Sequence, residues 1–122
     1  MVSSSDGFSA PTPRVPLTYR EYCYLPEDGR RYELMEGELY GTPAPTPFHQ
    51  TVSRRLQYAL MTALEETGIA FVFNAPIDVI LSDITVVQPD LAILATARKH
   101  LVTGRGIEGP PEVVVEILSP GT

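Results

Sequence analysis

The chain has 122 residues, of which 43% are hydrophobic and 20% are charged, and its formal net charge is −6. This composition is that of an ordinary folded domain and excludes an intrinsically disordered chain. The negative charge excludes a protein that relies on broad, non-specific attraction to phosphates, although a bound divalent cation reverses the charge locally. The single cysteine excludes an internal disulfide, and no run of residues is long and apolar enough to cross a membrane. We therefore expect a cytoplasmic protein without membrane contact.

The N-terminal residues differ in composition from the rest of the chain. Residues 1–16 are rich in Ser, Pro and Gly, and we expect them to form a flexible leader. The domain itself is then expected to span residues 17–122. At its start, Thr18 and Glu21 have the spacing of a capping box, which predicts a short helix.

A hairpin and one long helix follow the short helix. The turn signal Glu36-Gly37 lies between two short strand-like segments and predicts a β-hairpin. Thr46 before Pro47 is typical of a helix N-cap followed by proline at the first helical position. Apolar residues then recur with helical spacing up to Gly68, which predicts a long helix whose apolar stripe packs on a sheet.

The second half of the chain has the pattern of strands. We expect strands over residues 70–74, 77–81, 86–95 and 112–118. The order of elements predicts a mixed α/β domain, with a mixed central sheet flanked by helices. The last strand is so apolar that its second face needs cover, either from the leader and short helix, from a second copy or from further chain. We favour a C-terminal portion beyond Thr122, with which a homodimer is compatible.

Two carboxylates interrupt the last two of these apolar segments, namely Asp90 and Glu116. An ionised carboxylate on a strand buried on both faces is costly unless a cation or several hydrogen-bond donors hold it. On adjacent strands, the two acids could supply oxygen ligands to Mg²⁺, together with the backbone carbonyl of Ile117. The alternative is structural, because Pro89 favours an edge or bulge, so that Asp90 ends its strand and Glu116 faces water.

Six ordered blocks of the sequence form a series that is shared with a known family. They are Tyr32-Glu33-Leu34 with Gly37-Glu38-Leu39, Pro45-Thr46-Pro47-Phe48-His49, Ala75-Pro76-Ile77-Asp78-Val79, Val87-Gln88-Pro89-Asp90-Leu91, Arg105-Gly106-Ile107-Glu108-Gly109-Pro110-Pro111 and Val115-Glu116-Ile117-Leu118-Ser119-Pro120. The series resembles the Uma-two-type family of proposed restriction endonucleases, which belongs to the PD-(D/E)XK nuclease-like superfamily. The resemblance covers roughly residues 17–122.

The resemblance implies a restriction-endonuclease-like core in which Asp90 is the acid of the PD element and Glu116 the acid of the (D/E)XK element. Both would bind Mg²⁺ or Mn²⁺. His49 matches the histidine after the family's proline-rich loop, which implies a supporting role in orienting a ligand, a water or a phosphate. A histidine that only contacts the loop is an equal alternative. Glu36, in the hairpin block, is a weaker supporting candidate, and Asp78 is expected to make a structural hydrogen bond.

One departure from the family pattern concerns the lysine two residues after Glu116, where this chain has Leu118. In the family, a lysine from the following helix is thought to substitute. Our leading hypothesis is a metal-dependent DNA endonuclease that hydrolyses phosphodiester bonds. The acidic charge and the missing lysine favour an alternative, a catalytically inactive nuclease-fold domain that binds nucleic acid or a partner protein. A third hypothesis is a structural homodimer in which arginines across the interface pair with the two acids.

Overall fold

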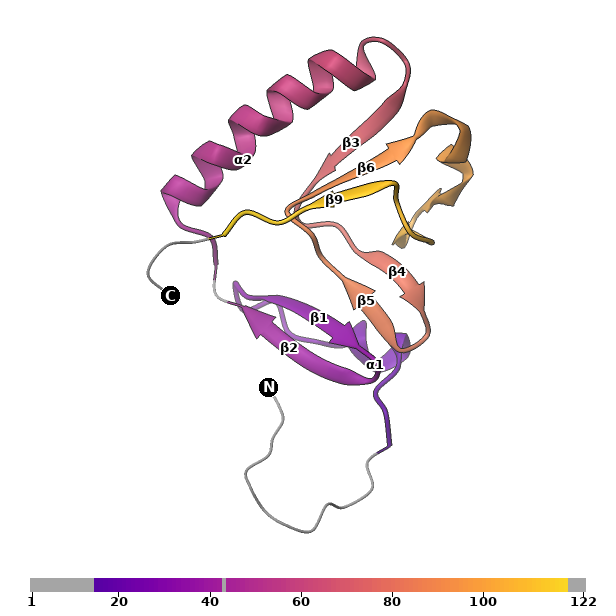
Figure 1. The fold of residues 1–122 in the computed structure, drawn as a ribbon. Coiled ribbons are helices and arrows are strands. Elements are labelled where there is room, and N and C mark those ends of the chain that lie inside the picture. Colours follow the sequence, from indigo (N-terminus) through magenta and orange to yellow (C-terminus); the bar gives the residue numbers. More distant parts are fainter. Residues whose placement is uncertain (1–14, 43, 119–122) are drawn as a thin grey trace.

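The computed structural model describes residues 15–42 and 44–118, which form two β-sheets and one long helix (Figure 1). The predicted leader lies almost entirely outside these residues, as does the chain beyond Leu118. Within the described part, the larger sheet has the strand order β2-β1-β5-β4-β8-β7 and the smaller one the order β3-β6-β9. In Figure 1 the smaller sheet lies next to α2, and the β1–β2 hairpin lies at the other end of the molecule.

The elements follow one another in a mixed α/β order. They are α1 (Tyr19–Tyr22), β1 (Arg31–Met35), β2 (Glu38–Thr42), α2 (Pro47–Leu60) with the π-helical turn η1 (Met61–Glu65), β3 (Ala70–Asn74), β4 (Val79–Ser82), β5 (Thr85–Val87), β6 (Leu91–Ala95), the 3₁₀ segment η2 (Thr96–Leu101), β7 (Val102–Thr103), β8 (Gly106–Ile107) and β9 (Val113–Val115). The larger sheet is mixed, because β4 and β8 are parallel whereas the other strand pairs are antiparallel.

The local signals in the first half of the chain are confirmed. Thr18 and Glu21 form the capping box of α1. Glu36 and Gly37 both have positive φ, 50° and 84°, which gives the β1–β2 hairpin the turn that matches the twist of its strands. A side chain at Gly37 would also collide with Pro16.

The long helix begins as its sequence indicates. The Thr46 hydroxyl accepts a hydrogen bond from the His49 backbone N–H at 3.2 Å, and Pro47 occupies the first turn. The helix continues through η1 towards Gly68, and both α2 and η1 contact β3. The apolar stripe of the helix therefore packs on the smaller sheet, as expected.

The strand predicted over residues 86–95 is wrong as a single element. The structure has two strands there, β5 and β6, which belong to different sheets and are joined by Gln88-Pro89-Asp90. Pro89 has no N–H and cannot donate to a ladder, so the chain leaves one sheet and enters the other at this point. Asp90 consequently lies at the junction of the two sheets and does not share a sheet face with Val86.

Two clusters of buried side chains hold the strands together. The first joins β4, β6 and β8 and consists of Val79, Ala92, Leu94 and Ile107. The second consists of Tyr22, Leu34 and Val86 and fixes the hairpin and α1 against β5. Among the described residues, no helix has the length and apolar character needed to span a membrane. The homodimer and the C-terminal portion stay predictions.

Candidate active site

The structure brings Asp90 and Glu116 together at one end of the smaller sheet. Strands β6 and β9 are antiparallel, and their ladder pairs Leu91 with Val115. Asp90 immediately precedes β6 and Glu116 immediately follows β9, so the two carboxylates stand opposite each other just beyond the last pair of the ladder. The register of β6 and β9 therefore places the two acids next to each other.

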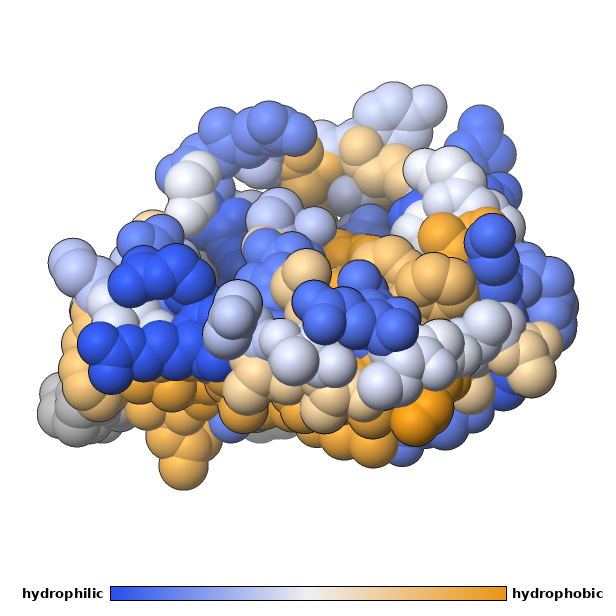
Figure 2. All heavy atoms as spheres, turned by 90° about the horizontal axis from the view of Figure 1, so that it is seen from above, coloured by the Kyte–Doolittle hydropathy of each residue, from blue (hydrophilic) through white to orange (hydrophobic). Residues whose placement is uncertain are grey.

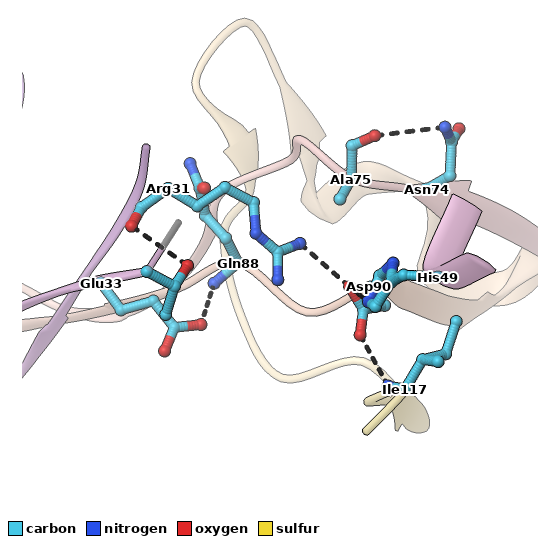
Figure 3. A network of polar contacts seen from close by, with 9 residues as sticks. Arg31, Glu33, His49, Asn74, Ala75, Gln88, Asp90 and Ile117 are labelled. Carbon is cyan, nitrogen blue, oxygen red and sulfur yellow. Dashed lines mark hydrogen bonds and ion pairs between the residues drawn. The ribbon is translucent and has the colours of Figure 1, made fainter. Parts of the chain in front are cut away.

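Asp90 is a buried carboxylate with three partners (Figure 3). Its side chain is only 2% exposed, and its Oδ1 atom lies 3.0 Å from Nη1 of Arg31 and 3.1 Å from Nε2 of His49. Its Oδ2 atom accepts a hydrogen bond from the backbone N–H of Ile117 at 2.6 Å. The donors that a buried charge requires are therefore supplied by three separate elements: the hairpin, the first turn of α2 and the chain after β9.

Glu116 lies at the exposed rim of this group, and its pKa is raised above the ordinary value of 4.5. Partial burial is the largest cause, followed by the negative charges of Asp90 and Glu33, while the Arg31 guanidinium opposes the shift. Two negative charges and one positive charge thus act on Glu116 at this point of the molecule.

The raised pKa of Glu116 gives a testable dependence of stability on pH. The folded state loses stability as the pH rises from about 4.5 through the raised pKa, because deprotonation is harder in the folded than in the unfolded chain. We expect Glu116→Gln to unfold at a higher urea concentration than the wild type at pH 8 in EDTA, with the difference vanishing near pH 4. Glu66→Gln, at an exposed position, is the control and should show no such trend. A pH-independent difference would contradict the assignment.

Two residues of this group, Arg31 and Glu33, were missed by sequence reasoning. They are two positions apart on β1 and therefore point to the same side of the strand. Oε2 of Glu33 accepts a hydrogen bond from the backbone N–H of Gln88 at 2.8 Å, which ties β1 to the link between the two sheets. Their alternation on the strand was visible in the sequence. The position of β1 beside Asp90 was not, because it depends on tertiary packing.

The structure places the other predicted residues as follows. Ile117 contacts Asp90 through its backbone N–H, whereas the sequence predicted that its carbonyl would be a metal ligand. Glu36 lies in the hairpin turn, where its backbone N–H donates to the Thr85 hydroxyl at 3.1 Å, and its side chain does not line the cavity described below. Asp78 accepts hydrogen bonds from the Tyr22 hydroxyl and the Gln88 side chain, which confirms its structural role.

Asp90 opens onto a cavity of about 1080 Å³ between α1, the β1 strand, the first half of α2 and the β7–β8 turn. Four arginines line it, namely Arg30, Arg31, Arg54 and Arg105. The whole chain has only nine lysines and arginines, and four of them line this cavity, together with the carboxylates Glu27, Asp78 and Asp90. Figure 2, seen from above, shows hydrophilic residues around a hollow and apolar ones along the lower edge of the view.

The donor set of this site suits a hard divalent cation. Mg²⁺ takes one or two carboxylates and completes its shell with water and phosphate oxygens, so Asp90 and Glu116 are sufficient protein ligands. The pKa of Glu116 is raised mainly by burial and then by the charges of Asp90 and Glu33, and such a cation would offset these negative charges. No three His, Cys, Asp or Glu side chains of residues 15–42 and 44–118 are grouped to hold a metal ion by themselves. The site therefore fits an ion that is held partly by protein carboxylates and partly by water or phosphate oxygens, and not an ion that side chains enclose completely.

Comparisons with known proteins identify the family of the chain and support its fold. The sequence model of the Uma2 family, described as "Putative restriction endonuclease", matches residues 18–122. Among solved structures, the chain is similar to a protein from Anabaena variabilis ATCC 29413 described as "a putative nuclease belonging to DUF820". The TM-score is 0.70 at 23% sequence identity, and the match covers 88% of this chain but 61% of that one. This likeness shows the fold, and the chain spans only that part of the longer protein. No match to a curated protein was found.

Proposed function

The chain belongs to the Uma2 family and has the mixed α/β fold of a restriction-endonuclease-like protein, and on this premise we propose that it is a metal-dependent DNA endonuclease. The family and the structural likeness support a nuclease. The observation that carries the proposal for this chain is the pairing of Asp90 with Glu116 at the end of β6 and β9, beside an arginine-lined cavity. Two carboxylates beside a cavity with four arginines combine the ligands of a cation with side chains that can bind phosphates.

In this proposal Asp90 and Glu116 hold Mg²⁺ or Mn²⁺. When bound, such an ion would offset the negative charge of a phosphoryl group and would make a water molecule easier to deprotonate. Asp90 is held in place by His49 and by the Ile117 backbone N–H, so its position is fixed before any substrate arrives. This preorganisation avoids the cost of arranging the site during the reaction.

His49 has the supporting role in the proposed site. Its backbone is fixed by the N-cap bond to Thr46, and its side chain is buried, with Nε2 directed at Asp90. The ring therefore keeps the Asp90 carboxylate in one orientation and lines the cavity next to it.

The arginines of the cavity would bind the DNA backbone. Guanidinium groups make paired hydrogen bonds to phosphate oxygens, and each phosphate contact adds about one unit to the dependence of binding on salt. Arg54 on α2 offers a clean test, because the adjacent Arg55 is exposed and does not line the cavity. We expect Arg54→Gln to weaken the binding of a labelled duplex oligonucleotide and to reduce its salt slope by about one.

The matched variant Arg55→Gln removes the same charge from the same turn of the helix and should leave the salt slope near that of the wild type. Fluorescence anisotropy at several salt concentrations measures both variants. Equal effects of the two substitutions would show that the helix attracts DNA only through its overall charge, and that the cavity is not the binding surface.

Cleavage of supercoiled plasmid tests the activity. We expect the wild-type chain to nick or linearise the plasmid in Mn²⁺ or Mg²⁺ and to leave it intact in EDTA. The alternative is an inactive nuclease-fold domain that binds nucleic acid. It is favoured by Leu118 at the position of the superfamily lysine and by the three partners that already engage Asp90. Metal-dependent DNA binding without cleavage would identify this alternative.

A further inference from the structure

The partners of Asp90 differ in how firmly they are held. The Ile117 contact comes from the backbone, and His49 is anchored by its buried ring and by the N-cap of α2. Arg31 is the exception, because its side chain is 22% exposed, lines the cavity and reaches Asp90 only through its terminal guanidinium. Arg31 can therefore leave Asp90 by rotating its own side chain, without disturbing a helix or a strand.

Arg31 also contacts the carboxylate oxygen at which the proposed metal ion would bind. It contacts Oδ1 of Asp90 at 3.0 Å, and its positive charge acts on Glu116 as well, where it opposes the raised pKa. A divalent cation shared by these two carboxylates would be repelled by a guanidinium at the same oxygen. The two positive groups thus compete for the same carboxylate oxygen of Asp90.

We propose that Arg31 is an exchangeable counterion of Asp90. In the metal-free protein the guanidinium neutralises the buried carboxylate. Upon binding of a divalent cation it is released into the cavity, where it binds a phosphate of the DNA. The inference rests on the proposed function, because it requires the metal site at Asp90 and Glu116. It assigns to Arg31 a positioning role in the metal-free state and a substrate-binding role in the loaded state.

The exchange couples metal binding to DNA binding. While Arg31 is paired with Asp90, it cannot serve the substrate, and after its release one further cation faces the cavity. By linkage, a cation that frees Arg31 strengthens DNA binding, and DNA strengthens binding of the cation by the same factor. Such coupling is absent if Arg31 is a permanent partner of Asp90.

Calorimetric titration with Mn²⁺ tests the first half of the inference, with the wild type, Arg31→Gln, Arg31→Lys and Asp90→Asn. The control Arg30→Gln removes the same charge from the neighbouring cavity residue, which does not pair with Asp90. We expect Arg31→Gln to bind Mn²⁺ about tenfold more tightly than the wild type, since a competing cation is gone. Its melting temperature in EDTA should be lower than that of the wild type, and Mn²⁺ should restore it. Arg30→Gln should behave as the wild type in both measurements.

Binding of a duplex oligonucleotide with cleavage-resistant phosphorothioate linkages tests the second half. We expect Arg31→Gln to bind only slightly more weakly than the wild type in EDTA, where Arg31 is tied to Asp90, and to bind several-fold more weakly than the wild type in Mn²⁺. Arg30→Gln, whose guanidinium is available in both states, should weaken binding to the same extent with and without metal.

The outcomes separate this inference from the proposed function. Mn²⁺ binding that is lost in Asp90→Asn but unchanged or weaker in Arg31→Gln would leave the metal site standing and overturn the exchange. An equal loss of DNA affinity by Arg31→Gln in EDTA and in Mn²⁺ would also overturn it. No Mn²⁺ binding by any variant would overturn the metal site and the exchange together. If Arg31→Gln does not fold, Arg31→Lys is decisive: we expect tighter Mn²⁺ binding than the wild type by a smaller factor, and equal binding contradicts the inference.

Discussion

Replacement of Asp90 by asparagine is expected to lower the rate of metal-dependent DNA cleavage by about 10³-fold or more, which corresponds to about 4 kcal/mol of transition-state stabilisation. The amide keeps the size of the side chain but removes the negative charge and one acceptor oxygen. A divalent cation then has only Glu116 as a carboxylate ligand, which is a poor site for an ion that is otherwise well hydrated. The partners of Asp90 lose their counter-charge at the same time.

The effect of Asp90→Asn on folding should be smaller than its effect on activity. Arg31 loses an ionic partner but is 22% exposed and can reach water, so we expect a cost of about 1–3 kcal/mol in the free energy of unfolding. Plasmid cleavage under single-turnover conditions and urea denaturation measure the two effects. Asp83→Asn, in the exposed turn between β4 and β5, is the matched control. Full activity of Asp90→Asn in a folded protein would remove Asp90 from the proposed site.

Leu34→Ala is expected to have the largest effect on stability, with a loss of about 2–5 kcal/mol in the free energy of unfolding. Leu34 is fully buried, packs with Tyr22 and Val86, and forms the ladder contact of β1 with β5. Truncation leaves a cavity at the point where the hairpin joins the larger sheet. The hairpin that presents Arg31 to Asp90 and Glu33 to Gln88 would be loosened.

The neighbouring position provides the control for Leu34→Ala. Met35 lies on the same strand but points to the other side and is 41% exposed, so Met35→Ala should cost little. Urea denaturation of both variants in EDTA gives the comparison. A loss below about 1 kcal/mol for Leu34→Ala would mean that the hairpin is not fixed by this cluster.

The sequence predicted the elements of this fold where local chemistry determines them. The capping box at Thr18, the hairpin turn at Glu36-Gly37 and the N-cap at Thr46 each depend on a few neighbouring residues, and each is confirmed. The prediction of one strand over residues 86–95 was wrong because the apolar run continues across Pro89. The hydrophobic pattern is the same whether the chain stays in one sheet or passes into another. A proline within a strand pattern was the signal for that break.

The candidate site shows the same limit. The sequence indicated Asp90 and Glu116 because charges within apolar runs are conspicuous, and the family resemblance added His49. Arg31 and Glu33 were not found, because charged residues on a hairpin strand are ordinary by themselves. Their importance comes from the packing of β1 against the link between the sheets, which no local pattern encodes. The role of Glu36 stays a prediction, although its side chain lies outside the cavity.

The central claim is that Asp90 and Glu116 together hold a divalent cation, and calorimetric titration of Mn²⁺ into the metal-free protein tests it most directly. The wild type and Glu66→Gln should bind one ion per chain with similar affinity, whereas Glu116→Gln should bind at least about tenfold more weakly. Asp90→Asn should show no saturable binding. Equal Mn²⁺ affinity in all four proteins, or no binding in the wild type, would contradict the claim.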